Sequence, residues 1–312
     1  MMMATNQEPS LRNIKAFRET VIKAENEMTN KKHQYDFYIY WSDKSIENKI
    51  EEHKEDGYSN VYDIIVNEDE SIYRTFEKTY QVFKYISESK DDYDLYVRIN
   101  ISAFINMKML DSVANVFKKS DIYCSAINSY INIESEYAND IYARGDFMLF
   151  GKNTLMAIVD NGEKYLYKDI DLKERINITH VDDCLMGLCV IDSFGKDYYK
   201  HIYMINYNFY PNSEDYKNIL INLHCIHHRV KTIPPTATVS GYSWDDNEWR
   251  EYDGKKMKFI QEKIDAVDVD YGKHKLPDVL VDKDQSRPTV FCQASHQNIF
   301  NVFWKYLEMK RQ

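Results

Sequence analysis

The chain has 312 residues, of which 44% are hydrophobic and 29% charged, and its formal net charge is −10. This length and composition fit one large α/β domain, alone or with a smaller appendage. The acidic balance disfavours a broad nucleic-acid-binding surface, because the phosphate backbone attracts basic proteins. No apolar run approaches the ~20 residues of a membrane-spanning helix, and the N-terminal residues hold no apolar core of signal-peptide length. We therefore expect no nucleic-acid partner and no membrane span.

Cysteine usage points to a reducing compartment. The five cysteines are odd in number, and none belongs to a C-x-x-C pair. Thiols without a pairing pattern are typical of cytosolic proteins. We therefore expect a cytoplasmic protein with reduced cysteines.

The first third of the chain alternates between helical and strand patterns. Apolar residues recur every three or four positions in two segments, and short β-branched and aromatic runs lie between them. In chain order the patterns predict a helix over 10–30, a strand over 35–41, an exposed helix over 45–57 that ends at Gly57, a strand over 61–66, a helix over 71–89 and a strand over 93–99. Such alternation favours a mainly parallel, mixed sheet flanked by helices.

The rest of the chain continues this alternation of strands and helices, and its composition changes near the C-terminal quarter. The predicted elements are strands over 122–128 and 147–151, helices over 152–159 and 182–195, and a strand-like segment over 200–210. From the paired prolines at Pro234 the sequence turns to loops, charged helical stretches and a closing helix over 300–312. We divide the chain into a core, residues 1–233, and a C-terminal extension, residues 234–312, that packs on the core.

Arg98, Asn100 and Ser102 alternate along one side of a predicted strand, at its carboxyl end. Ligands of open parallel sheets bind beyond the carboxyl ends of the strands. Arg98 could hold a phosphate with its planar fork of donors, and Asn100 and Ser102 could bind sugar hydroxyls. The structural alternative is local: Ser102 caps a helix, and Arg98 pairs with a carboxylate.

Two adjacent carboxylates, Asp182 and Asp183, open a predicted helix. A helix N-terminus stabilises an ionised carboxylate, which could then act as a general base toward an alcohol. The alternative is ordinary capping of the helix N-terminus.

Three histidines, His224, His227 and His228, lie within five positions. His224 and His228 would share one face of a helix, and the cluster would suit a metal only with a carboxylate nearby. A β-strand or a surface cluster is the alternative.

Taken in order, four segments resemble motifs of the β-1,3-glycosyltransferase and Fringe-type families, which have the GT-A fold. The matching segments, which together span roughly residues 35–210, are 62–86 with its pairs Asp63-Ile64, Glu70-Ser71 and Lys78-Thr79, then 94–106, then 142–150, and finally 181–187. The resemblance implies a GT-A-like α/β fold and an inverting glycosyltransferase of hexosyltransferase type. Its partners would be a nucleotide-sugar donor and a glycan or polysaccharide-precursor acceptor. The family's first nucleotide-binding strand has no obvious counterpart before Arg12, so its presence is left open.

The chain departs from this family at the metal motif. The aspartate triad that anchors Mn²⁺ or Mg²⁺ there falls on Asn100, Ile101 and Ser102. Neutral side chains hold hard cations poorly, so we do not favour a metal cofactor. We expect the guanidinium of Arg98 to neutralise the departing diphosphate instead.

The resemblance also implies roles for individual residues. Asp183 matches the proposed catalytic base, and Asp182 would orient it or bind the acceptor. The donor-binding residues would be Arg98, Asn100, Ser102, Lys78, Arg144, Gly145, Asp146, His228 and Arg229. For Lys78 a buried ion pair is the alternative role. Loss of the metal carboxylates also fits a rival class, a degenerate, non-catalytic glycan-binding or scaffold protein.

Overall fold

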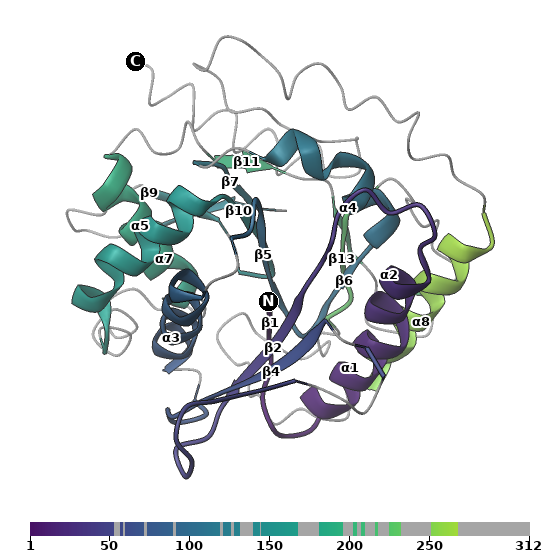
Figure 1. Ribbon diagram of the computed structural model, residues 1–312, viewed down its shortest axis with the longest axis horizontal. Helices are drawn as coiled ribbons and strands as arrows, with labels where there is room; N and C mark the ends of the chain where they lie inside the picture. Colours follow the sequence, from purple (N-terminus) through teal and green to yellow (C-terminus); the bar gives the residue numbers. More distant parts are fainter. Residues whose placement is uncertain are drawn as a thin grey trace.

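A mixed β-sheet between two groups of helices forms the centre of the molecule (Figure 1). The structure, a computed structural model, describes residues 1–52, 57–58, 60–71, 74–89, 92–118, 121–125, 128–131, 140–143, 145–167, 181–195, 202–204, 207–209, 216–217, 225–231 and 251–267. The main sheet has eight strands in the order β11-β7-β10-β5-β1-β2-β4-β3, and two smaller sheets have the orders β12-β13-β6 and β8-β9. The predicted α/β class, with a mixed sheet flanked by helices, is confirmed.

The strands of the main sheet run in both directions. Their bounds are β1 Met2–Met3, β2 Phe37–Ser42, β3 Lys49–Glu52, β4 Val61–Val66, β5 Tyr96–Asn100, β7 Tyr123–Ser125, β10 Phe147–Phe150 and β11 Ile202–Met204. The smaller sheets contain β6 Ala103–Ile105, β8 Asn128–Ile131, β9 Asp140–Ala143, β12 Tyr207–Phe209 and β13 His227–Arg229. Strands β4, β2, β1 and β5 are parallel to one another. Strand β10 lies antiparallel to both β5 and β7.

The helices fall into two groups. The first consists of α1 Ser10–Phe17, a π-helix Arg18–Ile22 and α2 Lys23–Glu27, which form one continuous rod, together with α4 Met107–Val113 and α8 Glu251–Asp265. The second consists of α3 Thr75–Glu88, α5 Lys152–Gly162 and α7 Val181–Phe194. Short 3₁₀ turns follow α4, at Ala114–Phe117, and α5, at Glu163–Tyr165.

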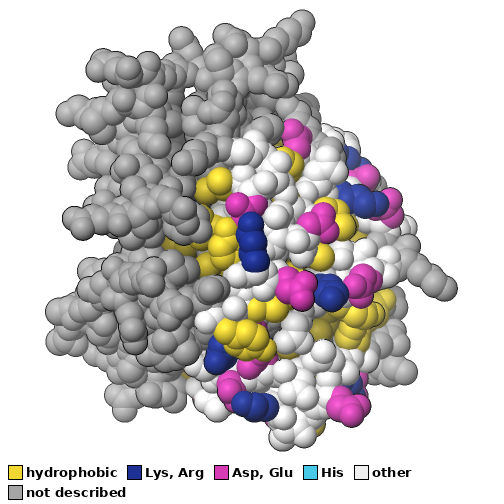
Figure 2. Space-filling model, turned by 90° about the vertical axis from the view of Figure 1, so that its left-hand side faces the viewer, with side chains coloured by type: hydrophobic (Ala, Val, Ile, Leu, Met, Phe, Trp, Pro, Cys, Tyr) yellow, Lys and Arg dark blue, Asp and Glu magenta, His cyan; other side chains and the backbone are white. Residues whose placement is uncertain are grey.

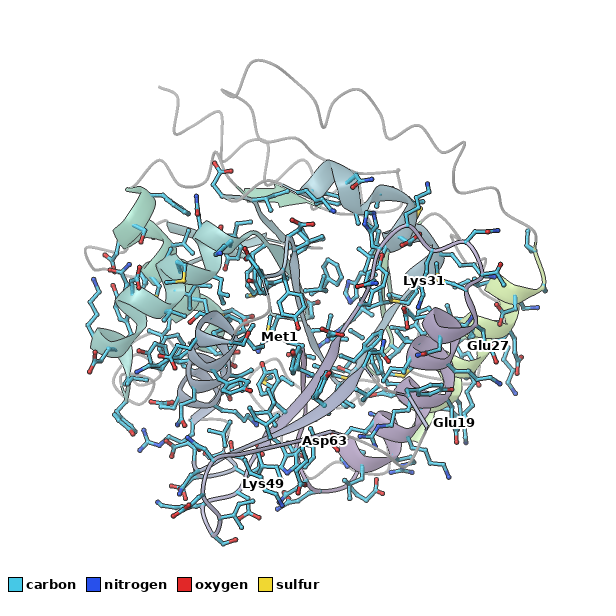
Figure 3. The ribbon with its side chains drawn as sticks, in the orientation of Figure 1. Met1, Glu19, Glu27, Lys31, Lys49 and Asp63 are labelled. Atoms are coloured by element: carbon cyan, nitrogen blue, oxygen red, sulfur yellow. The ribbon has the colours of Figure 1, made fainter. Side chains whose placement is uncertain are left out.

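Strand alternation divides the core into two layers. Ile39, Ile99 and Leu149 face the cluster that includes α1 and α8, whereas Tyr40 and Met148 face the cluster that includes α3, α5 and α7. Figure 1 shows the two helix groups on opposite sides of the sheet. In Figure 3, Met1 lies at the centre, between the two groups, and Glu19 and Glu27 lie on the outer side of the rod formed by α1, the π-helix and α2. Arg98, one position from Ile99, therefore faces the α3, α5 and α7 layer.

The predicted helix over 45–57 is wrong. Residues Lys49–Glu52 form β3 instead, antiparallel to β4, with Ile50 opposite Ile64. Ile50 also packs against the apolar layer under α3. Pairing with the open edge of β4 satisfies the backbone groups of this segment, and that tertiary contact overrides its helical propensity. Gly57 has φ of +73°, as expected for a glycine that ends an element.

Ser102 does not cap a helix. Residues Ala103–Ile105 form β6, which pairs with β13, and α4 begins only at Met107. The N-cap is Asn106, whose side chain accepts a hydrogen bond from the Met109 N–H at 3.1 Å. The same pairing shows that His227 and His228 lie on a strand, which was the alternative to a shared helical face. His224 lies outside the described residues.

A strand does precede the first helix. Met2 and Met3 form β1, which lies between β2 and β5 with Met2 opposite both Ile39 and Ile99. Both methionines and Ala4 are buried, so the segment contributes to the centre of the sheet. The sequence pattern missed this strand because two residues are too few to show a period.

Helix α8 packs against α1 and the π-helix. Its residues Met257, Ile260 and Ile264 are buried in the layer that includes α1. The predicted boundary at Pro234 and the predicted closing helix lie outside the described residues. Within the described ranges, no helix is both long enough and apolar enough to cross a lipid bilayer.

Candidate active site

The strand order places a topological switch point between β1 and β5. Strands β2 and β4 follow β1 on one side in chain order, and β5 then returns to the other side of β1. In open α/β sheets the crevice at such a reversal, beyond the carboxyl ends of the strands, is the usual ligand site. Here those ends are Met3 and Asn100, which lie opposite each other.

Arg98, on β5 just before this end, is completely buried and fully hydrogen-bonded. Its acceptors are the Tyr40 hydroxyl at 3.4 Å, the Gly145 carbonyl at 2.5 Å, Asp183 Oδ1 at 3.4 Å, Asp182 Oδ2 at 2.6 Å and the Met3 sulfur at 3.2 Å. A guanidinium has five N–H groups, so each can have one acceptor. In the described structure each donor of Arg98 therefore has a protein acceptor, and a contact between Arg98 and a diphosphate stays a prediction.

Asp182 and Asp183 lie in the first turn of α7, and both are largely buried. The helix N-terminus and the Arg98 guanidinium supply positive charge to this acidic pair. Of the two alternatives for Arg98, a phosphate contact or an ion pair with a carboxylate, the structure shows the ion pair. Its partners, Asp182 and Asp183, are the two predicted catalytic residues.

Gly145 lies where the two charged groups meet. Its carbonyl accepts a hydrogen bond from Arg98, and a Cβ at this position would collide with Arg98 Nη1 and Asp183 Oδ1. Only a glycine lets the backbone approach the ion pair this closely.

The environment of Asp183 favours its protonated form. Burial raises the pKa of Asp183 well above its usual range, and the negative charge of Asp182 raises it further. Arg98 and the backbone N–H of Gly145 act in the opposite direction. A raised pKa makes the ionised carboxylate a stronger base than that of an exposed aspartate.

Lys78 lies on α3 beside the end of β1. Its amine donates to Glu70 Oε1 at 2.6 Å and to the Ala4 carbonyl at 3.1 Å. Burial lowers its pKa, against the charge of Glu70. Glu70 Oε2 in turn accepts from the Ser42 N–H at the end of β2. Lys78 thus has the buried ion pair that was the alternative to a phosphate contact.

Asp146 and Arg229 meet in a second, smaller pair, with 3.8 Å between Asp146 Oδ2 and Arg229 Nε. Asp146 is close enough to Asp183 to raise its pKa. His228 is different: it is fully buried against Phe104, and burial lowers its pKa to about 3. A neutral, enclosed imidazole supplies no positive charge to a phosphate, and a donor contact of His228 stays a prediction.

Asn100 and Ser102 lie at the carboxyl end of β5 as predicted. Asn100 Oδ1 is buried with no hydrogen-bond partner in the part of the chain that the structure describes. Ser102 is buried, and its carbonyl accepts from the Val230 N–H at 3.1 Å. Arg144 lies outside the described residues.

The residues at this edge do not fit a divalent cation. An amide and a hydroxyl replace the family's carboxylates, and the carboxylates of Asp182 and Asp183 are paired with Arg98. Mg²⁺ and Mn²⁺ prefer charged oxygen ligands. Among the described residues, no group of three histidine, cysteine or acidic side chains is placed to hold a metal.

Sequence reasoning missed Tyr40 and Met3 as partners of Arg98. Both belong to apolar stretches, and no spacing or charge marks them as polar contacts. Only the arrangement of β1, β2 and β5 brings them together.

Comparison with known proteins does not assign this chain to a family. No family model matches the sequence, and no curated protein matches it. Among solved structures, a crystal structure of the glycosyltransferase GlyE from Streptococcus pneumoniae TIGR4 superimposes with a TM-score of 0.36 and 12% identity. The match covers 84% of this chain, and the chain spans 63% of the length of that structure. A TM-score this low establishes neither a common fold nor a common activity.

Proposed function

We propose that the chain is a glycosyltransferase of hexosyltransferase type that moves a sugar from a nucleotide-sugar to an acceptor hydroxyl with inversion. One observation carries the proposal. Arg98, Gly145 and the Asp182-Asp183 pair come from three sequence segments that resemble glycosyltransferase motifs, and they meet within 3.4 Å. They do so next to the switch point at which α/β sheets bind ligands.

In the proposed reaction, a carboxylate oxygen of Asp183 takes the proton of the acceptor hydroxyl. The acceptor oxygen forms a bond to the anomeric carbon of the donor sugar. The bond from that carbon to the diphosphate oxygen breaks, and the nucleoside diphosphate leaves with the electron pair. A single displacement of this kind inverts the anomeric configuration.

Arg98 acts in this proposal as a positioning residue. Its buried ion pairs hold Asp182 and Asp183 in one geometry, and its charge opposes the rise in the Asp183 pKa. Donor contacts fall to the residues around the crevice, where Asn100 Oδ1, which has no partner among the described residues, offers an acceptor for a hydroxyl. Ser102, Lys78, Arg144, Asp146 and Arg229 remain proposed donor-binding residues.

We propose that the reaction proceeds without a metal ion, because neither Asn100 nor Ser102 supplies the charged oxygen that a divalent cation prefers. We therefore expect turnover to continue after treatment with EDTA. Activity that disappears in EDTA and returns with Mn²⁺ would contradict this part of the proposal.

Replacement of Asp183 tests the catalytic assignment. Loss of a general base costs about 10²- to 10⁴-fold in rate, so Asp183→Asn should lose nearly all turnover and still bind the donor. Asp192→Asn, the same change later on α7 at an exposed position, is the matched control and should retain activity. Normal turnover by Asp183→Asn would move the base elsewhere, first to Asp182.

A non-catalytic protein is the second candidate, and the burial of the acidic pair favours it. Asp182 is 8% exposed and Asp183 is 4% exposed, so an acceptor reaches them only if neighbouring groups move. Incubation with a panel of nucleotide-sugars separates the candidates: an enzyme hydrolyses at least one donor slowly, whereas a non-catalytic protein hydrolyses none.

A further inference from the structure

Tyr167 has an unusual backbone conformation for an exposed aromatic residue. It follows the 3₁₀ turn after α5, has φ of +63°, and is 58% exposed. Among the described residues it is the only non-glycine with positive φ. Figure 2 shows charged side chains of both signs over the face of α3, α5 and α7, with apolar side chains between them.

This backbone conformation costs free energy, and Tyr167 does not offset the cost by packing in the hydrophobic core. A bulky residue in the left-handed region carries about 1–3 kcal/mol of strain. The preceding residue, Leu166, packs against the α3, α5 and α7 layer, but Tyr167 is not among the side chains that pack there. Strain of this kind persists at ligand sites more often than elsewhere.

Two side chains hold Tyr167 in place: Glu77, on α3, and Arg74, the residue before α3. The Glu77 carboxylate accepts a hydrogen bond from the Tyr167 N–H. The Arg74 guanidinium lies 4.7 Å from the centre of the Tyr167 ring, within the range of a cation–π contact. Arg74 also pairs with Glu77 at 3.5 Å. Arg74 therefore covers one face of the ring, and Glu77 contacts both Arg74 and the Tyr167 N–H.

One carboxylate oxygen of Glu77 takes no part in these contacts. Glu77 is 1% exposed, and burial raises its pKa. Its Oε1 atom bonds Arg74 and Tyr167, but its Oε2 atom is buried with no hydrogen-bond partner among the described residues. A buried carboxylate oxygen without a donor is costly, so the arrangement favours a ligand that supplies one.

These three residues lie beside the candidate active site. Glu77 is adjacent in sequence to Lys78, whose amine contacts the Ala4 carbonyl at the end of β1. The charges of Asp182 and Arg98 both act on Lys78. A ligand that rests on Tyr167 would therefore extend from the edge of the sheet at which Asp182 and Asp183 lie.

We propose that Tyr167, Arg74 and Glu77 form a subsite for a pyranose ring. The apolar face of the sugar would stack on the open face of Tyr167, and a sugar hydroxyl would donate to Glu77 Oε2. Arg74, on the other face, would hold the ring in place. The subsite deepens the proposed function by naming its substrate class, although binding at it does not require turnover.

The experiment measures binding to the full chain by saturation-transfer NMR and titration calorimetry. The probes are UDP-glucose, UDP-galactose, GDP-mannose, the methyl glycosides of the same sugars, and UDP and GDP without sugar. Tyr167→Asn removes the ring and still tolerates left-handed backbone, whereas Tyr167→Phe keeps the ring. Tyr85→Asn, at a tyrosine of α3 that is 44% exposed, is the matched control.

We expect Tyr167→Asn to weaken binding of at least one sugar-bearing probe by roughly tenfold, and Tyr167→Phe and Tyr85→Asn to bind as the wild type does. Because strain is relieved, the melting temperature of Tyr167→Asn should equal or exceed that of the wild type. Methyl glycosides that retain the effect assign the subsite to an acceptor sugar; an effect confined to nucleotide-sugars assigns it to the donor sugar.

Several results would overturn the subsite. These are unchanged binding by Tyr167→Asn, a clear fall in its melting temperature, equal weakening of UDP or GDP without sugar, or no binding of any probe by the wild type. If ring-dependent sugar binding is found but no nucleotide-sugar is turned over, the subsite stands and the proposed transferase activity fails.

Discussion

Arg98 combines full burial with ion pairs to two carboxylates, and this determines what its replacement should do. Removing the cation leaves Asp182 and Asp183 buried without the positive charge that they pair with. The loss of one member of a buried pair is much more costly than the net stability of the pair, because the remaining charge stays desolvated.

We expect Arg98→Met to lower the free energy of unfolding by about 3–5 kcal/mol, measured by urea denaturation. Arg98→Lys should lose less stability than Arg98→Met, since an amine supplies the charge but not the planar fork. Lys152→Met, at an exposed lysine paired with Asp92, is the control and should leave the free energy of unfolding nearly unchanged. A loss for Arg98→Met no larger than the control's would contradict the buried network.

The raised pKa of Asp183 predicts a pH dependence of stability. A group that binds its proton more tightly in the folded state stabilises the fold at low pH, and this contribution is lost as pH rises above the ordinary carboxyl range toward the folded pKa. Relative to Asp183→Asn, the wild type should therefore lose up to about 1.4 kcal/mol of unfolding free energy per pH unit in that window.

Comparison with the variant is essential, because other groups act in the opposite direction. Burial lowers the pKa of the Met1 amine to about 5 and that of His228 to about 3, and both raise stability as pH increases. Chemical denaturation of both proteins from pH 4 to pH 8 provides the test. A constant difference between the two curves would show that the pKa of Asp183 is not raised.

At the scale of elements, the segment after β5 depends on a competition between strand and helix. Residues 103–105 could continue into the helix that follows, but β13 pairs with them and α4 starts later. The cap therefore moves from Ser102 to Asn106, whose side chain satisfies the Met109 N–H.

This placement of the cap predicts different costs for two alanine substitutions. Asn106→Ala should destabilise the fold by about 0.5–2 kcal/mol because the N–H of Met109 loses its acceptor. Ser102→Ala should cost less, since the N-cap of α4 is Asn106 and not Ser102. Thermal unfolding of both variants measures the difference, and a larger loss for Ser102→Ala would mean that the helix begins earlier.

At the scale of the whole molecule, α8 belongs to the same core as α1. Met257, Ile260 and Ile264 are buried among residues from the first thirty and from β2, β5 and β10. Packing of α8 on α1 thus joins the two ends of the described chain (Figure 1). A fragment ending at residue 233 would expose this apolar layer to water.

Truncation of Ile260 tests this packing. We expect Ile260→Ala to cost about 2–5 kcal/mol, as for other fully buried isoleucines, whereas Glu262→Ala on the exposed side of α8 should change stability by less than about 0.5 kcal/mol. Both values come from urea denaturation. Equal small effects would mean that α8 is a loosely attached appendage.

Much of this architecture was predictable from local pattern. The strand at Val61–Val66, the helix that became α5 and the helix opened by Asp182 all have a period or a cap in their own residues. Likewise, the alternation of strands and helices was enough for the α/β class, because each element shows its buried face in its own sequence. The charge and residue type of Arg98 and the two aspartates were also visible without a structure.

Only tertiary structure decided what these residues contact. Tyr40, Gly145 and Asp182 are far apart in sequence, yet β1, β2, β5, β10 and α7 bring them to one guanidinium. The same holds for β1, β3 and β6, whose strands exist because a neighbouring edge pairs with them. Local sequence encodes the period of an element and the chemistry of a side chain. Its partners, its burial and hence its pKa depend on residues that the chain brings close only when it folds.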